Sequence, residues 1–255
     1  MPASSSERPS RTSEQFASQV NRMFDRIAGQ YDALNSVMTV GLHHRWRQRA
    51  AARAQLTEGG SALDVCTGTG DLALAFDRAA GRRTKVIAAD FCQPMLDIGR
   101  EKAARAGAAD RVTFLTADTE SLPLPSETFQ IVSVAFGLRN VADTDRGLAE
   151  MVRVAAPGGR VAVLEFSTPT WQPFKAIYGW YFRNVLPRIG QFFARNSSAA
   201  YEYLPESVVQ FPQGEALAAR MRAAGLESVR CYPLTFGVAS LYVGTKSTET
   251  ADGRR

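Results

Sequence analysis

Apolar residues in this chain follow two spacings: short unbroken runs, and longer stretches in which they recur every three or four positions. Short runs bounded by turn residues are typical of buried strands, and the longer spacing is typical of helices. The runs predict strands at 62–66, 85–90, 112–116, 130–135, 160–166, 228–233 and 239–245. The helical spacing predicts helices between them at 71–80, 94–107, 144–155 and 214–224. Strands joined by helices form a parallel sheet covered on both faces, so we predict an α/β fold whose last two strands make a hairpin-like edge.

Two further segments extend this core. Residues 16–54 are predicted to be a mostly helical N-terminal cover, and residues 173–203 an inserted helical cover. The polar ends, 1–14 and 247–255, are predicted to be disordered tails. Because no flexible linker or internal repeat separates the rest, we expect a single domain over 15–246.

The composition narrows the classes of partner. The 255 residues carry a net charge of +5, which suggests a nucleic acid or an anionic membrane. The basic residues are spread along the chain without a stripe of stacking aromatics, so we expect no nucleic-acid partner. The three cysteines are far apart and form no C-x-x-C pair, which favours a reducing cytoplasm and no zinc or other metal site. No apolar run is long enough to span a membrane, and the oligomeric state stays open, with a homodimer as one alternative.

A glycine loop follows the first predicted strand. Gly68 and Gly70 lie between that strand and a helix, a turn in which a ligand can approach the backbone and the helix N–H groups. Asp90 closes the second strand 22 positions after Gly68, where a carboxylate can bind ribose hydroxyls. The pattern therefore predicts a nucleotide-type cofactor at this loop.

Two carboxylates bracket the loop and indicate which cofactor it binds. Asp64 and Asp71 would repel a pyrophosphate, whereas they suit a ligand that carries an ammonium and a sulfonium. This arrangement looks like the S-adenosylmethionine loop of Rossmann-like class I methyltransferases, which have a mostly parallel seven-stranded sheet. Asp118 follows the third strand, where such enzymes hold the adenine edge. We therefore predict this fold and S-adenosylmethionine as the cofactor, with Asp64 among its binding residues.

Longer motifs point to one family. They read YDALN at 31–35, GLHHRWR at 41–47, AFGLRNV at 135–141, PGGR at 157–160, LEFS at 164–167 and YEYLPES at 201–207. Over about residues 22–246 the chain resembles the UbiE/MenG/COQ5 quinone C-methyltransferases. The resemblance implies that S-adenosylmethionine is contacted by Thr69, Asp90, Asp118 and Thr119 around a loop shaped by Gly68 and Gly70.

The resemblance also implies the substrate, a quinol with a polyprenyl tail. It favours conversion of demethylmenaquinol to menaquinol in menaquinone biosynthesis, with the ubiquinone precursor as the alternative. His44, Thr119 and Tyr242 depart from the family's usual residues, and because of His44 and Tyr242 the choice between the two quinols stays open. From other classes, an RNA methyltransferase, a nicotinamide dehydrogenase and a non-catalytic binding protein with this fold are kept as alternatives.

Methyl transfer to a ring carbon requires loss of a hydroxyl proton and stabilisation of the phenolate. Arg139 and Asn140 follow the fourth strand at its carboxyl end, so we predict that Arg139 stabilises the phenolate and that Asn140 orients it or a water. His43 is a candidate general base, since histidine titrates near neutral pH, with a structural or membrane-facing role as the alternative. Tyr201 and Tyr203 are either quinol-pocket or core aromatics.

A polyprenyl quinol resides in the bilayer, so a route to the membrane is needed. Residues 174–186 have helical apolar spacing with basic residues nearby, which fits an interfacial helix or a lid that closes the pocket. We therefore expect a cytoplasmic protein, with peripheral contact to an anionic membrane at the inner face of the cell as an open alternative.

Overall fold

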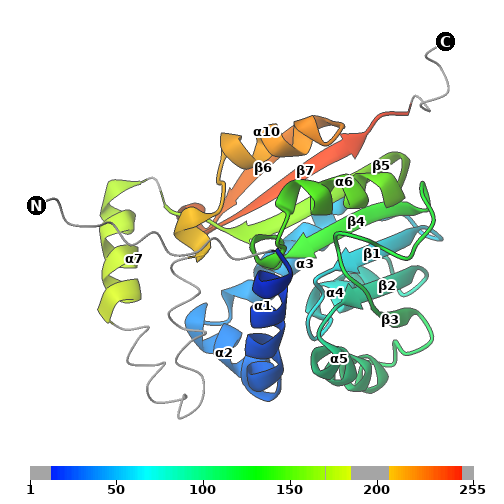
Figure 1. Ribbon diagram of the computed structural model, residues 1–255, viewed down its shortest axis with the longest axis horizontal. Helices are drawn as coiled ribbons and strands as arrows, with labels where there is room; N and C mark the ends of the chain where they lie inside the picture. The colour runs from blue at the N-terminus through cyan, green and yellow to red at the C-terminus, as the bar shows by residue number, and fades with distance from the viewer. Residues whose placement is uncertain (1–12, 170, 185–206, 249–255) are drawn as a thin grey trace, which may run out of the picture.

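The computed structural model describes residues 13–169, 171–184 and 207–248, and one seven-stranded sheet runs through them (Figure 1). The strand order is β3-β2-β1-β4-β5-β7-β6. The strands are β1 (Ser61–Val65), β2 (Lys85–Asp90), β3 (Val112–Thr116), β4 (Phe129–Ala135), β5 (Ala155–Phe166), β6 (Leu226–Leu234) and β7 (Ala239–Lys246). The first five are parallel, and β7 pairs antiparallel with both β5 and β6. The predicted α/β sheet and its hairpin-like edge are confirmed.

Helices cover both faces of this sheet. On one face α3 (Leu42–Ala54), α4 (Asp71–Ala79) and α5 (Gln93–Arg105) form a core with the strands through side chains such as Trp46 and Phe76. On the other face α6 (Thr144–Val154) and α10 (Glu215–Ala223) form a second core through side chains such as Leu148 and Leu217. The central strands β1 and β4 are therefore buried on two sides, which explains why their sequences are mostly apolar, whereas Thr113 and Thr116 of the edge strand β3 are exposed.

The N-terminal cover is helical, as expected. It consists of α1 (Ser13–Ile27), η1 (Ala28–Gln30) and α2 (Tyr31–Met38), followed by α3. Helix α1 includes Ser13 and Glu14, the last two residues of the tail predicted at 1–14. The other residues predicted as tails lie outside the described residues, apart from 247–248.

The inserted cover is described only in its first part. Helix α7 (Gln172–Asn184) lies there, while 185–206, including Tyr201 and Tyr203, fall outside the described residues. Of the helices that the structure describes, none has the length and apolarity needed to cross a bilayer.

Strand β5 begins five residues earlier than predicted. The predicted helix ends at 155 and the predicted strand begins at 160, but Ala155 already pairs with Phe129, and Arg160 pairs with Ile131 beyond Pro157 and two glycines. The chain passes this point as an irregularity in the register, with Gly158 at a φ of +72°, a conformation that glycine adopts freely.

One aromatic ring fits against two glycines where α5 meets β3. A Cβ built on Gly99 would overlap the ring of Phe114, and one built on Gly70 in the glycine loop would come within 2.9 Å of it. The ring therefore requires both positions to lack a side chain.

We predict that Gly99→Ala lowers the free energy of unfolding by about 1–2 kcal/mol, because the overlap outweighs the gain in helix propensity. Urea denaturation measures this. Gly29→Ala is the matched control, since no atom lies within 4 Å of a Cβ there, and it should be close to neutral. A Gly99→Ala protein as stable as the wild type would show that the ring can move aside.

Candidate active site

A small cavity lies at the carboxyl ends of β1, β2 and β4. It is lined by Phe24, Tyr31, Cys66, Gly68, Asp90, Phe91, Met95, Phe136, Gly137 and Asn140. Strand β1 has β2 on one side and β4 on the other, so the chain reverses its direction of travel across the sheet at this point. Open α/β sheets bind ligands at such a position. The N-terminal cover closes the cavity through Phe24 and Tyr31.

Asp90 and the glycine loop meet in this cavity, as the sequence predicted. The buried carboxylate of Asp90 accepts hydrogen bonds from the backbone N–H of Gly68 at 2.8 Å and from that of Cys92 at 2.9 Å. Burial raises the pKa of Asp90 even though these N–H groups oppose the shift. Each oxygen still has lone pairs for a further donor, so Asp90 can accept ligand hydroxyls.

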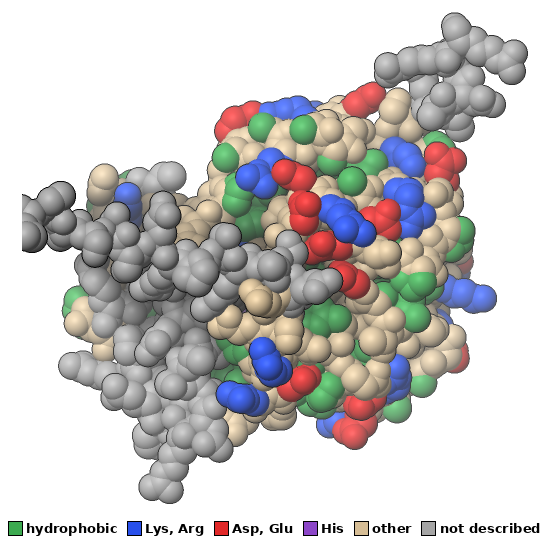
Figure 2. Space-filling model, viewed as in Figure 1, with side chains coloured by type: hydrophobic (Ala, Val, Ile, Leu, Met, Phe, Trp, Pro, Cys, Tyr) green, Lys and Arg blue, Asp and Glu red, His purple; other side chains and the backbone are tan. Residues whose placement is uncertain are grey.

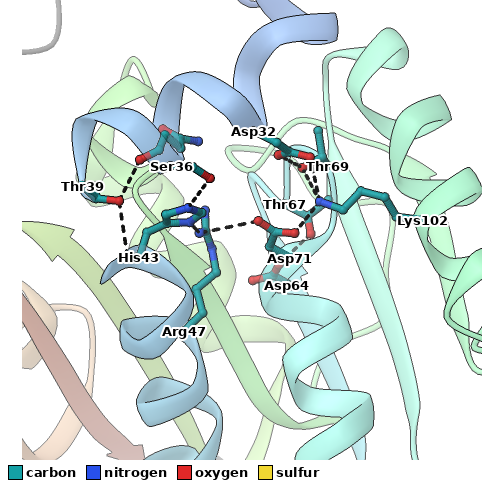
Figure 3. Close-up of polar contacts among 11 residues, drawn as sticks. Asp32, Ser36, Thr39, His43, Arg47, Asp64, Thr67, Thr69, Asp71 and Lys102 are labelled. Atoms are coloured by element: carbon teal, nitrogen blue, oxygen red, sulfur yellow. Dashed lines mark hydrogen bonds and ion pairs between the residues drawn. The ribbon is translucent and has the colours of Figure 1, made fainter. Parts of the chain in front are cut away.

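Asp64 lies beneath the loop and does not line the cavity (Figure 3). Its carboxylate accepts hydrogen bonds from the hydroxyls of Thr67, at 2.6 Å, and Ser133, at 2.8 Å. Burial raises the pKa of Asp64 to about 6. Asp64 therefore holds the loop through Thr67, and its contact with a cofactor stays a prediction.

Thr69 and Asp71 are engaged on the side of the loop toward α2 and α5. The Thr69 hydroxyl donates to Asp32 at 2.6 Å and accepts from Lys102 at 3.1 Å. Asp71 forms ion pairs with Lys102 and, at 3.6 Å, with Arg47. Burial alone would raise the pKa of Asp71, but these two cations hold it below its usual value. The loop does not carry the uncompensated negative charge that Asp64 and Asp71 were expected to provide, because each carboxylate has partners from elsewhere in the fold.

Asp118 and Thr119, which the resemblance assigns to the cofactor, do not line the cavity. The Thr119 hydroxyl is buried within 3.3 Å of the sulfur of Cys66, which lines the cavity. Asp118 is exposed and accepts a hydrogen bond from the backbone N–H of Glu120. Contact of either residue with a cofactor stays a prediction.

Arg139 lies in η2 (Leu138–Asn140), directly after β4, and is held by a residue that was given no role from the sequence. Its Nη1 donates to Glu165 at 2.9 Å and to the carbonyl of Phe136, and the two charged side chains are only 7% and 2% exposed. Glu165 is the last residue but one of β5, the strand next to β4, and lies in the LEFS motif. Its position could have suggested a role in the site, because it is an acidic residue at the carboxyl end of a predicted central strand.

The Arg139 ion pair leaves one donor without an acceptor. The Nε of Arg139 is buried and has no hydrogen-bond partner, which in the described part of the chain is true of only two other side-chain atoms. An unsatisfied buried donor is costly unless a ligand supplies the acceptor. Asn140, the next residue, lines the cavity.

His43 is buried in α3 and does not line the cavity. Its Nδ1 contacts the guanidinium of Arg47, which can only donate, so Nε2 carries the proton and donates to Ser36 at 3.2 Å. Burial and the charge of Arg47 lower the pKa of His43 to about 3. A group with so low a pKa is a very weak base, so the candidate role of His43 as general base is not supported.

Three side chains next to the loop have the atom types of metal ligands. The ligand atoms of His43, His44 and Asp71 lie within 4.8 Å of one another. Arg47 and Lys102 already neutralise Asp71, however, so a further cation there would meet two positive charges.

The pKa of Asp64 gives a test of how the loop is built. Because its folded pKa of about 6 lies above the unfolded value of about 3.9, the folded state binds more protons between these values and stability falls as pH rises through them. We predict that Asp64→Asn removes this loss, so that the variant gains about 2–3 kcal/mol relative to the wild type between pH 4 and 7.

Urea denaturation at several pH values measures the difference. Asp110→Asn, which removes the same charge from an exposed side chain, is the control and should follow the wild-type slope. Parallel curves for wild type and Asp64→Asn would contradict the buried, proton-retaining carboxylate.

Known proteins match most of this chain. The model of the ubiE/COQ5 methyltransferase family matches residues 11–246. The ubiquinone/menaquinone biosynthesis C-methyltransferase UbiE of Geobacter sulfurreducens is 44% identical over 227 residues, 89% of this chain and 88% of the relative. The UbiE protein of Escherichia coli K12 is 42% identical over 233 residues, 91% of this chain and 92% of the relative.

Solved structures show the fold. A SAM-dependent methyltransferase from Aquifex aeolicus superposes with a TM-score of 0.55 at 18% identity, covering 90% of this chain and 97% of the other. The [4+2]-cyclase SpnF superposes with a TM-score of 0.68, also at 18% identity, covering 96% and 100%. The predicted Rossmann-like class I methyltransferase fold is therefore confirmed, while a cyclase of the same fold shows that architecture alone does not decide the reaction. The family match and the 42–44% identical relatives show that this chain belongs to the ubiE/COQ5 methyltransferase family.

Proposed function

We propose that this protein transfers a methyl group from S-adenosylmethionine to a ring carbon of a polyprenylated quinol, converting demethylmenaquinol to menaquinol. The observation that carries the proposal is the unpaired, buried Nε of Arg139. Arg139 does not itself line the aromatic cavity, but it lies directly before Asn140, which does. A phenolate oxygen is the kind of acceptor that such a donor lacks. Membership of the family supports the class of reaction.

The cavity suits S-adenosylmethionine on two counts. Asp90 presents a carboxylate whose orientation is fixed by two backbone N–H groups, as ribose hydroxyls require. A side chain at Gly68 would extend toward Tyr31 and Met95, both within 3.6 Å of its Cβ, so the space at the loop is kept free by glycine. When bound, the cofactor supplies an electrophilic methyl group on a sulfonium.

The other residues predicted to bind the cofactor do not line the cavity. Gly70 shapes the loop with a φ of +79°, and Thr119 contacts Cys66, which lines the cavity. Thr69 and Asp64 hold the loop from outside, and Asp118 is assigned to the adenine on its position after β3.

The chain's own residues supply the chemistry on the quinol side. Phe24, Phe91 and Phe136 give the cavity apolar walls that exclude water from an aromatic ring. The guanidinium of Arg139 lowers the pKa of a hydroquinone hydroxyl next to it, which makes loss of the proton to water feasible without a histidine. Glu165 keeps the guanidinium in place, and Asn140 orients the hydroxyl or a water.

Turnover with alternative substrates tests the proposal. Labelled S-adenosylmethionine is incubated with short-tailed demethylmenaquinol, the matching ubiquinol precursor, or RNA, and we expect label in demethylmenaquinol at the highest kcat/KM. Preferred labelling of the ubiquinol precursor would assign the other quinol branch, labelling of RNA alone would support an RNA methyltransferase, and binding without turnover a non-catalytic protein.

Arg139→Lys tests the role of the unpaired donor. Lysine keeps the charge that Glu165 needs but removes the Nε–H, so we predict a fall in kcat of about 100-fold with an unchanged Kd for the cofactor by calorimetry. Arg153→Lys is the matched control, because Arg153 also forms a salt bridge with a glutamate, Glu150, on a helix away from the cavity. Near-normal turnover of Arg139→Lys with unchanged cofactor affinity would contradict the role.

We further propose that the quinol is reached at an anionic bilayer, at the inner face of the cell membrane. Trp171 and Trp180 at α7 and Phe236 in η3 (Thr235–Gly237) are 58%, 56% and 65% exposed, and the rings of Trp171 and Phe236 lie 6.0 Å apart. Exposed aromatic side chains with Lys175 nearby suit a lipid interface. By contrast, acidic and basic side chains alternate over α6 and α10 on the face seen in Figure 2.

A lid and a membrane contact are compatible in α7. The Tyr181 hydroxyl donates to the carbonyl of Met38 at 3.3 Å, so this side chain faces the end of α2, while Trp180 is exposed. The side chains of Phe174, Ile177, Tyr178 and Phe182, on which the predicted stripe rests, lie outside the described atoms.

Liposome flotation tests the membrane contact. We predict that the protein floats with vesicles that contain phosphatidylglycerol and less with pure phosphatidylcholine, and that Trp171→Ala combined with Phe236→Ala lowers the bound fraction about tenfold. Val209→Ala removes an equally exposed apolar side chain and should have no effect. If the protein bound neither kind of vesicle, the proposed membrane contact would be wrong.

A further inference from the structure

A chain of charged and polar side chains links α2 to the glycine loop (Figure 3). Asp32, in the first turn of α2, accepts from Lys102 at 2.9 Å and from the Thr69 hydroxyl at 2.6 Å. Lys102 extends from α5 and also contacts Thr69 and Asp71. One ammonium group thus joins the cover helix, the loop and the start of α4.

A second connection leaves α2 one turn later and reaches the same carboxylate. Ser36 accepts from His43, the other ring nitrogen of His43 contacts Arg47, and Arg47 lies 3.6 Å from Asp71. Residues 32 and 36 are four positions apart and lie on one face of a helix. Helix α2 is therefore held at two points along one face, and both connections end at Asp71.

The apolar contacts of α2 reach the rest of the fold only near its two ends. Its buried Leu34 lies in a cluster formed by residues of the N-terminal cover itself. Outside the cover, Met38 packs against the core on the α3 face of the sheet, and Tyr31 packs with Cys92 and Met95. The polar network adds two connections from α2 to Asp71, next to the glycine loop.

Tyr31, which immediately precedes Asp32, is the residue that this position affects. Its ring lines the cavity and faces Gly68. Phe24 meets the ring edge-on at a centroid distance of 6.0 Å, so the two aromatic groups form one wall. A displacement of α2 would move this wall away from the loop.

Lys102 is the residue of the network whose loss has the largest expected effect. It is mostly buried between two carboxylates, and no other described cation forms a salt bridge with Asp32. Without the ammonium, Asp32 and Asp71 would face each other across Thr69, and like charges in a partly buried setting repel.

We propose that Lys102 is a positioning residue, which holds α2 and Tyr31 against the glycine loop and so completes the cofactor cavity. The identity of the ligand rests on the function proposed above, whereas the positioning of α2 does not. The YDALN and GLHHRWR motifs then contribute to the same network, Asp32 from the first motif and His43 and Arg47 from the second.

Hydrogen exchange of the full-length, cofactor-free protein tests the positioning. In Lys102→Met we expect the amides of 31–38 to exchange about tenfold faster while those of β1 and β4 keep the wild-type rate, as local opening predicts. Lys102→Arg should restore most of the protection. Arg105→Met, which removes an exposed ion-paired cation from the same helix, should leave α2 unchanged.

Binding and turnover test the consequence. We expect Lys102→Met to raise the calorimetric Kd and the KM for S-adenosylmethionine about tenfold while kcat at saturation stays within about twofold. Asp32→Asn should also raise the Kd and the KM for S-adenosylmethionine. The double variant should bind S-adenosylmethionine no more weakly than Lys102→Met alone, because the two side chains are coupled.

Wild-type exchange in α2 of Lys102→Met would overturn the proposal, as would faster exchange spread evenly over the sheet or an equal effect of Arg105→Met. A fall in kcat without a change in Kd or KM would also overturn it. If the wild-type protein binds no S-adenosylmethionine, the proposed function fails, and hydrogen exchange still decides whether Lys102 positions α2.

Discussion

The hydrogen bond between the Asp90 carboxylate and the backbone N–H of Gly68 joins the two central features of this protein, the end of β2 and the glycine loop. A parallel sheet brings the ends of its strands to one edge, and there each buried carboxylate needs partners to offset its desolvation. Asp64 finds hydroxyl groups and Asp71 finds two cations, while Asp90 is satisfied by backbone N–H groups. Of these three, Asp90 is the one that lines the cavity, because backbone donors fix it without filling the space in front of it.

The same edge contains strained backbone. Cys66 and Phe136, which follow β1 and β4, have φ values of 48° and 60°, in a region that residues other than glycine rarely occupy. A Cβ on Gly137 would overlap Cys66, so the two strand ends approach closely only because glycine follows Phe136. Such strain is tolerated where surrounding contacts determine the conformation, and here it turns Cys66, Phe136 and Gly137 to the cavity.

Most of the fold could be predicted because its signals are local. Strands β2 and β3 have the predicted bounds, since a buried strand between turn residues is written in adjacent positions. Strand β5 differed because pairing with β4 carried the chain through Pro157 and two glycines that locally resemble a break. In the site, the pairing of Gly68 with Asp90 was foreseeable from their places at two strand ends, and so was the position of Asn140 after β4.

The sequence by itself determined the parallel sheet, the glycine loop, the acid that closes β2 and the family motifs, because each depends on neighbouring residues along the chain. Only the tertiary structure decided which of these groups carry charge toward a ligand. Lys102 neutralises Asp71 from 31 positions away, and Glu165 pairs with Arg139 from the adjacent strand. His43 shows the same dependence, since burial against Arg47 turns a histidine expected to titrate near neutral pH into a very weak base. Charge, pKa and free donors are set by the atoms that folding brings together, and no local spacing specifies them.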